Sequence, residues 1–287
     1  MSALRVHVRR RLLIAALAAA TATVSGCGSD EPRPLTIRHR LDAKTRALFA
    51  YERNRPLRIG VRRRTTAQGV TVEDLTYRSP GNGTIAAYVV KPAEGNTGEA
   101  GIVFLHWTYN GPDRDEFLGE ARSYAKHGVT SLLVGEKRSV GNSDMVVDIE
   151  RGVDLLLERE HVDPARIGFV GHSMGAVVGG VVAGVETRIR AYVLMAGSTG
   201  FPPFPEPFIG QAAPARLFFQ FGKRDEIISP DDAREYAVRA SEPKRVGWYD
   251  AEHDLNDARA REDRAEWLRE QLGFDAAGNY RGRVATR

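Results

Sequence analysis

A serine at the centre of the pentapeptide Gly171-His172-Ser173-Met174-Gly175 is the side chain best placed to do chemistry in this sequence. The pentapeptide follows a short apolar run, residues 167–170, and opens a stretch over 173–185 that is apolar on all sides. This order predicts a buried strand, a tight turn and a buried helix. Such a turn lifts the serine Oγ above the sheet, and the helix N-terminus faces developing negative charge. We therefore expect Ser173 to act as a nucleophile.

A serine hydroxyl needs a base to take its proton, and two later residues suit the roles of acid and base. Asp225 follows a predicted strand over 215–221, and His253 follows the last predicted strand, 245–249. Loops after parallel strands share one edge of a sheet, so both side chains can meet Ser173 there. His253 is then the general base, and Asp225 orients its imidazole and stabilises the imidazolium.

Other acidic residues near Asp225 compete for its role. Glu226 is the main alternative. Asp231 and Asp232 follow Ser229-Pro230, a pattern typical of the first turn of a helix, so we expect them to have a structural role.

Other histidines are less suited to be the base. His172 adjoins Ser173 and cannot turn back onto its Oγ, so we expect it in the core or in a pocket wall. His106 is expected to support the loop that follows its strand, and His127 and His161 are expected at the surface.

Alternating short apolar runs and amphipathic segments surround these residues. Strands are predicted over 70–77, 84–90, 101–105, 129–134, 167–170, 190–195, 215–221 and 245–249. Helices are predicted over 41–52, 113–127, 143–160, 173–185, 231–240 and 257–272. This alternation predicts an α/β fold, a mostly parallel sheet of about eight strands with helices on both faces and an antiparallel edge. Residues 196–214 are too few for a large cap domain.

The segment Val162-Asp163-Pro164-Ala165-Arg166-Ile167-Gly168-Phe169-Val170-Gly171-His172-Ser173-Met174-Gly175-Ala176 is the most distinctive part of the chain. Together with the later Asp225 and His253, it resembles serine hydrolases of the α/β-hydrolase fold, in the dienelactone-hydrolase-like and acyl-peptidase-like group. The resemblance covers roughly residues 70–273. Dienelactone hydrolases proper use cysteine as the nucleophile, so the serine here argues against that particular activity.

The resemblance also implies an oxyanion hole. In such relatives the backbone N–H groups that bind the oxyanion come from the residue after the nucleophile and from the loop after a neighbouring strand, here Met174 and Thr108. Trp107 stands where these relatives have glycine, so Tyr109 is the alternative second donor.

Aromatic residues near these loops could line an apolar pocket for the acyl group. They are Trp107, Tyr109, Phe201, Phe204 and Phe208. An equally good interpretation is that several of them simply cover the core.

The N-terminal residues have the pattern of an export signal. Arg9-Arg10-Arg11 precedes an apolar run over 12–24, and Val24-Ser25-Gly26-Cys27 resembles a bacterial lipobox, whose cysteine carries a diacylglyceryl group. Cys27 is the sole cysteine. We thus expect a signal peptide over 1–26, a lipid-anchored polar tether over 27–55, a catalytic domain over 56–275 and a C-terminal tail over 276–287. The twin-arginine and general secretory export routes both stay open.

Charge argues against a nucleic-acid partner. Residues 1–26 hold four arginines and no acid, so removing them leaves 37 of the 41 basic residues against 37 acidic ones, a formal net charge of zero. The local basic run over 53–64 is either a solvated face or a contact with anionic lipid headgroups. No cluster has metal-ligand spacing, and the predicted chemistry needs no cofactor.

The sequence therefore predicts an exported, membrane-anchored serine hydrolase that cleaves carboxylic esters of a small-molecule acyl substrate through an acyl-enzyme. Peptidase or thioesterase activity of the same fold is the first alternative. A non-catalytic lipoprotein that uses the fold for binding is the second. Nothing in the sequence indicates an oligomeric state.

Overall fold

The computed structural model describes residues 41–93, 100–106, 114–135 and 143–274. The strands within these ranges are β1 (Gly60–Ala67), β2 (Val70–Ser79), β3 (Gly83–Pro92), β4 (Gly101–Leu105), β5 (Thr130–Val134), β6 (Ile167–His172), β7 (Ala191–Met195), β8 (Arg216–Gly222) and β9 (Lys244–Tyr249). The helices are α1 (Ala43–Ala47), α2 (Leu118–Ala125), α3 (Ser143–Glu158), α4 (Met174–Val185), α5 (Glu206–Ile209), α6 (Pro230–Arg239) and α7 (Ala258–Leu272).

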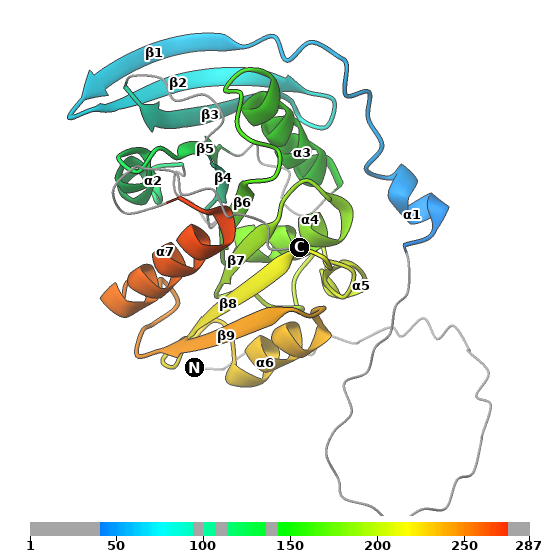
Figure 1. The fold of residues 1–287 in the computed structure, drawn as a ribbon. Helices are drawn as coiled ribbons and strands as arrows, with labels where there is room; N and C mark the ends of the chain where they lie inside the picture. The colour runs from blue at the N-terminus through cyan, green and yellow to red at the C-terminus, as the bar shows by residue number, and fades with distance from the viewer. Residues whose placement is uncertain (1–40, 94–99, 107–113, 136–142, 275–287) are drawn as a thin grey trace, which may run out of the picture. The chain divides into compact units, whose positions relative to one another are not determined.

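All strands of the described ranges join one sheet, in the order β1-β2-β3-β5-β4-β6-β7-β8-β9 (Figure 1). Pairing is antiparallel from β1 through β2 and β3 to β5, and parallel from β5 to β9. The predicted mostly parallel sheet with an antiparallel edge is confirmed. Between β7 and β8 the only helix is the four-residue α5, so no large cap is inserted there.

The sheet has one more strand than the sequence predicted. Strand β1 contains the basic run Arg62-Arg63-Arg64, and all eight of its residues are exposed. Since neither face of β1 is buried, its sequence lacks the apolar alternation that marks a strand. It pairs with β2, with a shift of register between Val61 and Arg63. Charged side chains on such an edge strand oppose pairing with another sheet.

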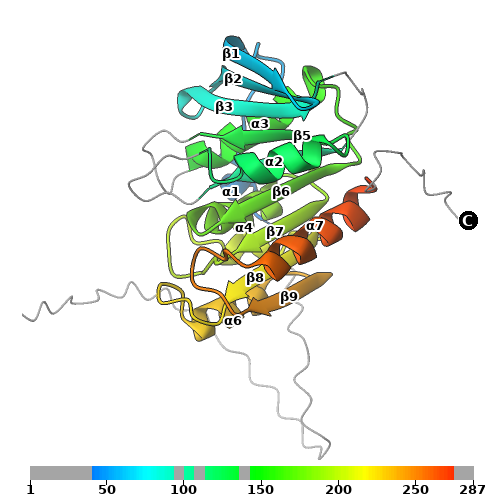
Figure 2. The same cartoon turned by 90° about the vertical axis from the view of Figure 1, so that its left-hand side faces the viewer.

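Two hydrophobic cores lie on opposite faces of the sheet. One packs α3, α4, α5 and α6 against the sheet through residues such as Ile149, Val178 and Tyr236. The other packs α2 and α7 through Phe117 and Leu268. Figure 2 looks onto the face that α2 and α7 cover. The sheet is therefore covered on both faces, as the alternation of strands and helices predicted.

Residues 41–55, which the sequence assigned to a polar tether, pack against the folded domain. Leu41 and Phe49 are buried, and the ring of Phe49 meets Phe208 edge-on. No helix within the described ranges is long and apolar enough to span a bilayer.

Candidate active site

A sharp turn between β6 and α4 presents Ser173. The residue has φ 54° and ψ −114°, a backbone conformation that L-residues rarely adopt, and it is the N-cap of α4. A Cβ on Gly171 would lie 2.3 Å from the carbonyl oxygen of Gly175, and a Cβ on Gly175 would lie 2.1 Å from that of Leu105. Both glycines are therefore required by sterics, which is why the pentapeptide has this pattern.

Ser173, His253 and Asp225 form a chain of hydrogen bonds. Nε2 of His253 lies 2.8 Å from the Oγ of Ser173, and Nδ1 lies 2.9 Å from Oδ2 and 3.1 Å from Oδ1 of Asp225. Asp225 follows β8 and His253 lies in the loop after β9, so the carboxyl ends of β6, β8 and β9 bring the three side chains together. With its Nδ1–H donated to Asp225, the imidazole turns a lone pair on Nε2 toward the serine hydroxyl.

The carboxylate of Asp225 is held in its charged form. Its side chain is 3% exposed, and its Oδ1 accepts hydrogen bonds from the backbone N–H groups of Ile227 and Ile228. Burial alone would raise the pKa of Asp225, but the hydrogen bonds from His253 and from these two amides lower it below the ordinary value. A fixed anion is what the imidazole needs when it gains a proton.

Asp225, rather than one of its competitors, contacts Nδ1 of His253. Glu226, the alternative acid, is exposed, while Asp231 and Asp232 occupy the first turn of α6. His127 is half-buried and His161 is exposed. The structure thus brings together the three residues that the sequence selected.

The sequence and the fold were compared with those of known proteins. The sequence matches no family model and no curated protein. Among solved structures, an acetyl xylan esterase from a Paenibacillus species is 16% identical, covers 75% of this chain and 89% of that chain, and has a TM-score of 0.62. A cold-adapted esterase from an Arctic intertidal metagenomic library is 15% identical, covers 73% and 97%, and has a TM-score of 0.63. A proposed dienelactone hydrolase from Klebsiella pneumoniae is 13% identical, covers 71% and 98%, and has a TM-score of 0.57.

The chain has the α/β-hydrolase fold. At sequence identities this low, the similarity to these structures shows the fold alone, and the chemistry depends on the residues of this chain.

One of the two expected oxyanion donors is described. Met174 is the first residue of α4, so its backbone N–H has no carbonyl partner within the helix and lies next to the Oγ-bearing residue. Thr108, its alternative Tyr109, and Trp107 lie outside the described residues.

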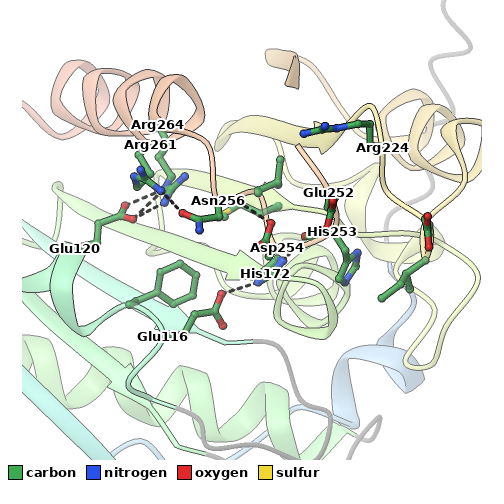
Figure 3. Close-up of a pocket in the computed structure, with 15 residues that line it drawn as sticks. Glu116, Glu120, His172, Arg224, Glu252, His253, Asp254, Asn256, Arg261 and Arg264 are labelled. Atoms are coloured by element: carbon green, nitrogen blue, oxygen red, sulfur yellow. Dashed lines mark hydrogen bonds and ion pairs between the residues drawn. The ribbon is translucent and has the colours of Figure 1, made fainter. Parts of the chain in front are cut away.

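A cavity of about 670 Å³ opens beside His253 (Figure 3). Its walls come from the turn before α2 and the start of that helix, the ends of β6 and β7, the loops that follow β8 and β9, and the first half of α7. Most of its lining is polar: the acids are Glu116, Glu120, Glu226, Glu252 and Asp254, the bases are Arg224, Arg261 and Arg264, and His172 and Asn256 complete it with His253. Phe117, Met195, Ile227 and Leu255 are its apolar members.

The aromatic residues expected around an acyl pocket do not line this cavity where they are described. Phe208 is buried in the core against Phe49, which matches the open alternative that these side chains cover the core. Phe201 and Phe204 are exposed. Neither of them is among the residues that line the cavity.

Two residues of the cavity wall, His172 and Glu116, contact each other, and the sequence predicted the position of only the first. His172 was expected in a core or pocket wall, and it lies there, 2% exposed. Its partner Glu116 was missed, because the predicted helix over 113–127 begins only at Leu118 and leaves residues 114–117 as a turn. Within the described ranges, no group of three His, Cys, Asp or Glu side chains could hold a metal ion.

Proposed function

We propose that this protein is a serine hydrolase that cleaves carboxylic esters. The observation that carries the proposal is the chain of hydrogen bonds from Ser173 through His253 to Asp225, at the turn where Ser173 has φ 54°. The solved structures with this fold include proteins named as esterases, which supports the same activity.

The reaction follows from the geometry. The Oγ of Ser173 attacks the ester carbonyl carbon while Nε2 of His253 takes the hydroxyl proton. The negative charge moves to the carbonyl oxygen, where the N–H of Met174 stabilises it; one such donor is worth roughly 3 kcal/mol of barrier. The C–O bond then breaks, and His253 gives its proton to the leaving alkoxide. Water cleaves the acyl-enzyme by the same route, with His253 first as base and then as acid.

We also propose that the substrate is polar. The cavity beside His253 is not lined by Ser173 itself, so we place there the part of the substrate that lies beyond the ester group. Ten of its fifteen lining residues, His253 not counted, are charged residues, asparagine or histidine. Carboxylates accept hydrogen bonds from hydroxyl groups and arginines donate them, so hydroxyl-bearing ester substrates suit this wall better than long alkyl chains do.

Activity-based labelling tests the proposal. A fluorophosphonate probe should label Ser173 in folded protein, as read by mass spectrometry of the labelled peptide, and Ser173→Ala should remove the label. In a panel of acetyl esters, those of hydroxyl-bearing alcohols should give a higher kcat/KM than those of long-chain alkyl alcohols. Absence of label on folded protein would overturn the hydrolase proposal, and a preference for long alkyl chains would overturn only the polar substrate.

The same panel separates the related activities. Including a thioester and a peptide anilide distinguishes esterase from thioesterase and peptidase, because all three would pass through the same acyl-enzyme. A non-catalytic binding protein would turn over none of them and would leave the probe unreacted.

We propose further that the protein is exported and held at the extracytoplasmic face of the cell membrane by lipid on Cys27. The support is in the sequence: Cys27 is the sole cysteine and follows Val24-Ser25-Gly26 behind an apolar run. Two acyl chains, at roughly 0.8 kcal/mol per buried methylene, anchor a domain stably. Mass spectrometry should find a mature chain that begins at a modified Cys27. A soluble mature form that lacks Cys27 would contradict the anchor.

A further inference from the structure

A second chain of hydrogen bonds runs beside the first. Nδ1 of His172 lies 2.6 Å from Oε1 of Glu116, and Nε2 of His172 lies 2.8 Å from the backbone carbonyl oxygen of His253. Figure 3 shows Glu116 pointing at His172 from the turn before α2, with His253 beyond it. None of the steps of ester cleavage uses this chain.

The contacts of His172 fix how many protons the pair carries. A carbonyl oxygen only accepts, so Nε2 of His172 must carry a proton and donate it to the carbonyl of His253. A further proton must lie between Nδ1 and Oε1, on the imidazole or on the carboxyl, because two lone pairs cannot face each other at 2.6 Å. In both arrangements the pair of Glu116 and His172 holds two protons and has no net charge.

This pair joins the two loops that carry the reaction. His172 is the last residue of β6 and adjoins Ser173, while His253 lies in the loop between β9 and α7. We propose that His172, oriented by Glu116, is a positioning residue that holds the backbone of His253 at the correct distance from Ser173. The proposal rests on the proposed hydrolase function.

Glu116 has a separate role, which is to orient the ring of His172. The rings of His172 and His253 have centroids 5.4 Å apart. Glu116 holds the other ring nitrogen, Nδ1, and so fixes the orientation of the His172 ring. In that orientation Nε2–H points at the carbonyl of His253, and the neutral pair places no net charge beside the base.

Two substitutions at His172 separate positioning from packing. Phe keeps the ring but loses the donor, whereas Gln keeps an N–H at about the reach of Nε2. We expect His172→Phe to lower kcat roughly 10- to 100-fold with KM within about threefold, the cost of a misplaced base. His172→Gln should recover most of that kcat. Thermal unfolding of both variants shows how much folded enzyme each assay contains.

Glu116 provides a second pair of variants. Glu116→Ala should lower kcat by about tenfold, and Glu116→Gln, whose amide can still meet Nδ1, should stay close to wild type. Glu160→Gln is the matched control: it also removes a paired carboxylate, but Glu160 pairs with Lys91 and Arg159 beyond the C-terminal end of α3. It should leave kcat unchanged.

The outcomes distinguish this inference from the proposed function. If wild-type Ser173 reacts with the probe and His172→Phe keeps the wild-type kcat, or if Phe and Gln are equally impaired, the positioning role is overturned. If wild-type protein does not react, the hydrolase proposal is overturned instead. Nitrogen-15 spectra of histidine-labelled protein add a readout besides activity. Wild-type His172 without a proton on Nε2 would overturn the bond to His253.

Discussion

Two clusters of polar side chains in this molecule both contain buried charged groups, but they differ in access to solvent and in backbone strain. One is the triad, at the carboxyl ends of β6, β8 and β9. The other, here called the α3 charge network, lies between α3, the end of α4 and the segment that precedes β1. Its members are Tyr51, Glu150, Arg151, Asp154, Glu186 and Arg188.

In the α3 charge network, opposite charges are matched. Arg188 contacts Glu186 at 2.5 Å and Asp154 at 2.5 Å, and Arg151 also bonds Asp154. The guanidinium of Arg151, 1% exposed, donates to the backbone carbonyls of Arg53 and Arg55 as well. The network therefore fastens the chain before β1 to α3, and this is why residues 41–55 are part of the folded domain.

The triad differs in access and in strain. Ser173 is half-buried in an uncommon backbone conformation, and His253 lines an open cavity. Arg151 and Asp154, by contrast, are covered and satisfy one another. Burial of charge alone thus does not distinguish the proposed active site from the α3 charge network. The strained backbone of Ser173 and the position of His253 at a cavity do distinguish it.

The strongest test of this difference is at the acid of the triad. Asp225→Asn should leave the fold intact but lower kcat by roughly 10²- to 10⁴-fold, because the amide no longer holds the right tautomer of His253 or stabilises its imidazolium. Steady-state hydrolysis of the best ester of the panel measures it. Glu226→Gln tests the alternative acid and should lower kcat much less, because the carboxylate that contacts Nδ1 of His253 is that of Asp225. The reverse order of losses would transfer the role of acid to Glu226.

In the α3 charge network the expected loss is in stability. Arg188→Ala leaves the buried Glu186 without its cation and Asp154 with Arg151 alone as its cation, which should lower the free energy of unfolding by about 3–5 kcal/mol. Urea denaturation measures it. Arg234→Ala removes an exposed pair with Asp231 and should cost at most about 1 kcal/mol. The kcat of folded Arg188→Ala should equal that of wild type; a large drop in kcat would mean that the network and the triad are coupled.

The positions of the three triad residues could be predicted from the sequence because each depends on local structure. Gly171 and Gly175 are required by the turn, and the loops after parallel strands place Asp225 and His253 at the edge where Ser173 lies. The parallel strands were predicted to within about two residues of their observed ends, since each is a short, mostly apolar run.

The parts that sequence reasoning missed depend on contacts between distant segments. Strand β1 is fully exposed and has no apolar pattern of its own. Glu116 gains its role only because the turn before α2 lies against His172. The attachment of residues 41–55 rests on Arg151, whose partners are nearly a hundred residues away and are backbone carbonyls, which no side-chain pattern encodes.

An effect that depends on pH is expected at Glu150, inside the α3 charge network. Burial, and then the charge of Glu186, raise the pKa of Glu150 from the ordinary 4.5 to about 8. Between these pH values the folded protein holds a proton that the unfolded chain releases, so this group lowers the free energy of unfolding as pH rises through that window. Glu150→Gln cannot lose the proton. Relative to wild type, the variant should therefore gain stability from pH 5 to pH 9 in urea denaturation and match it below about pH 4. Its kcat should not change, because the triad lies elsewhere. A stability difference that does not vary with pH would show that Glu150 is ionised in the folded protein and paired like its neighbours, and the α3 charge network would then be fully charged.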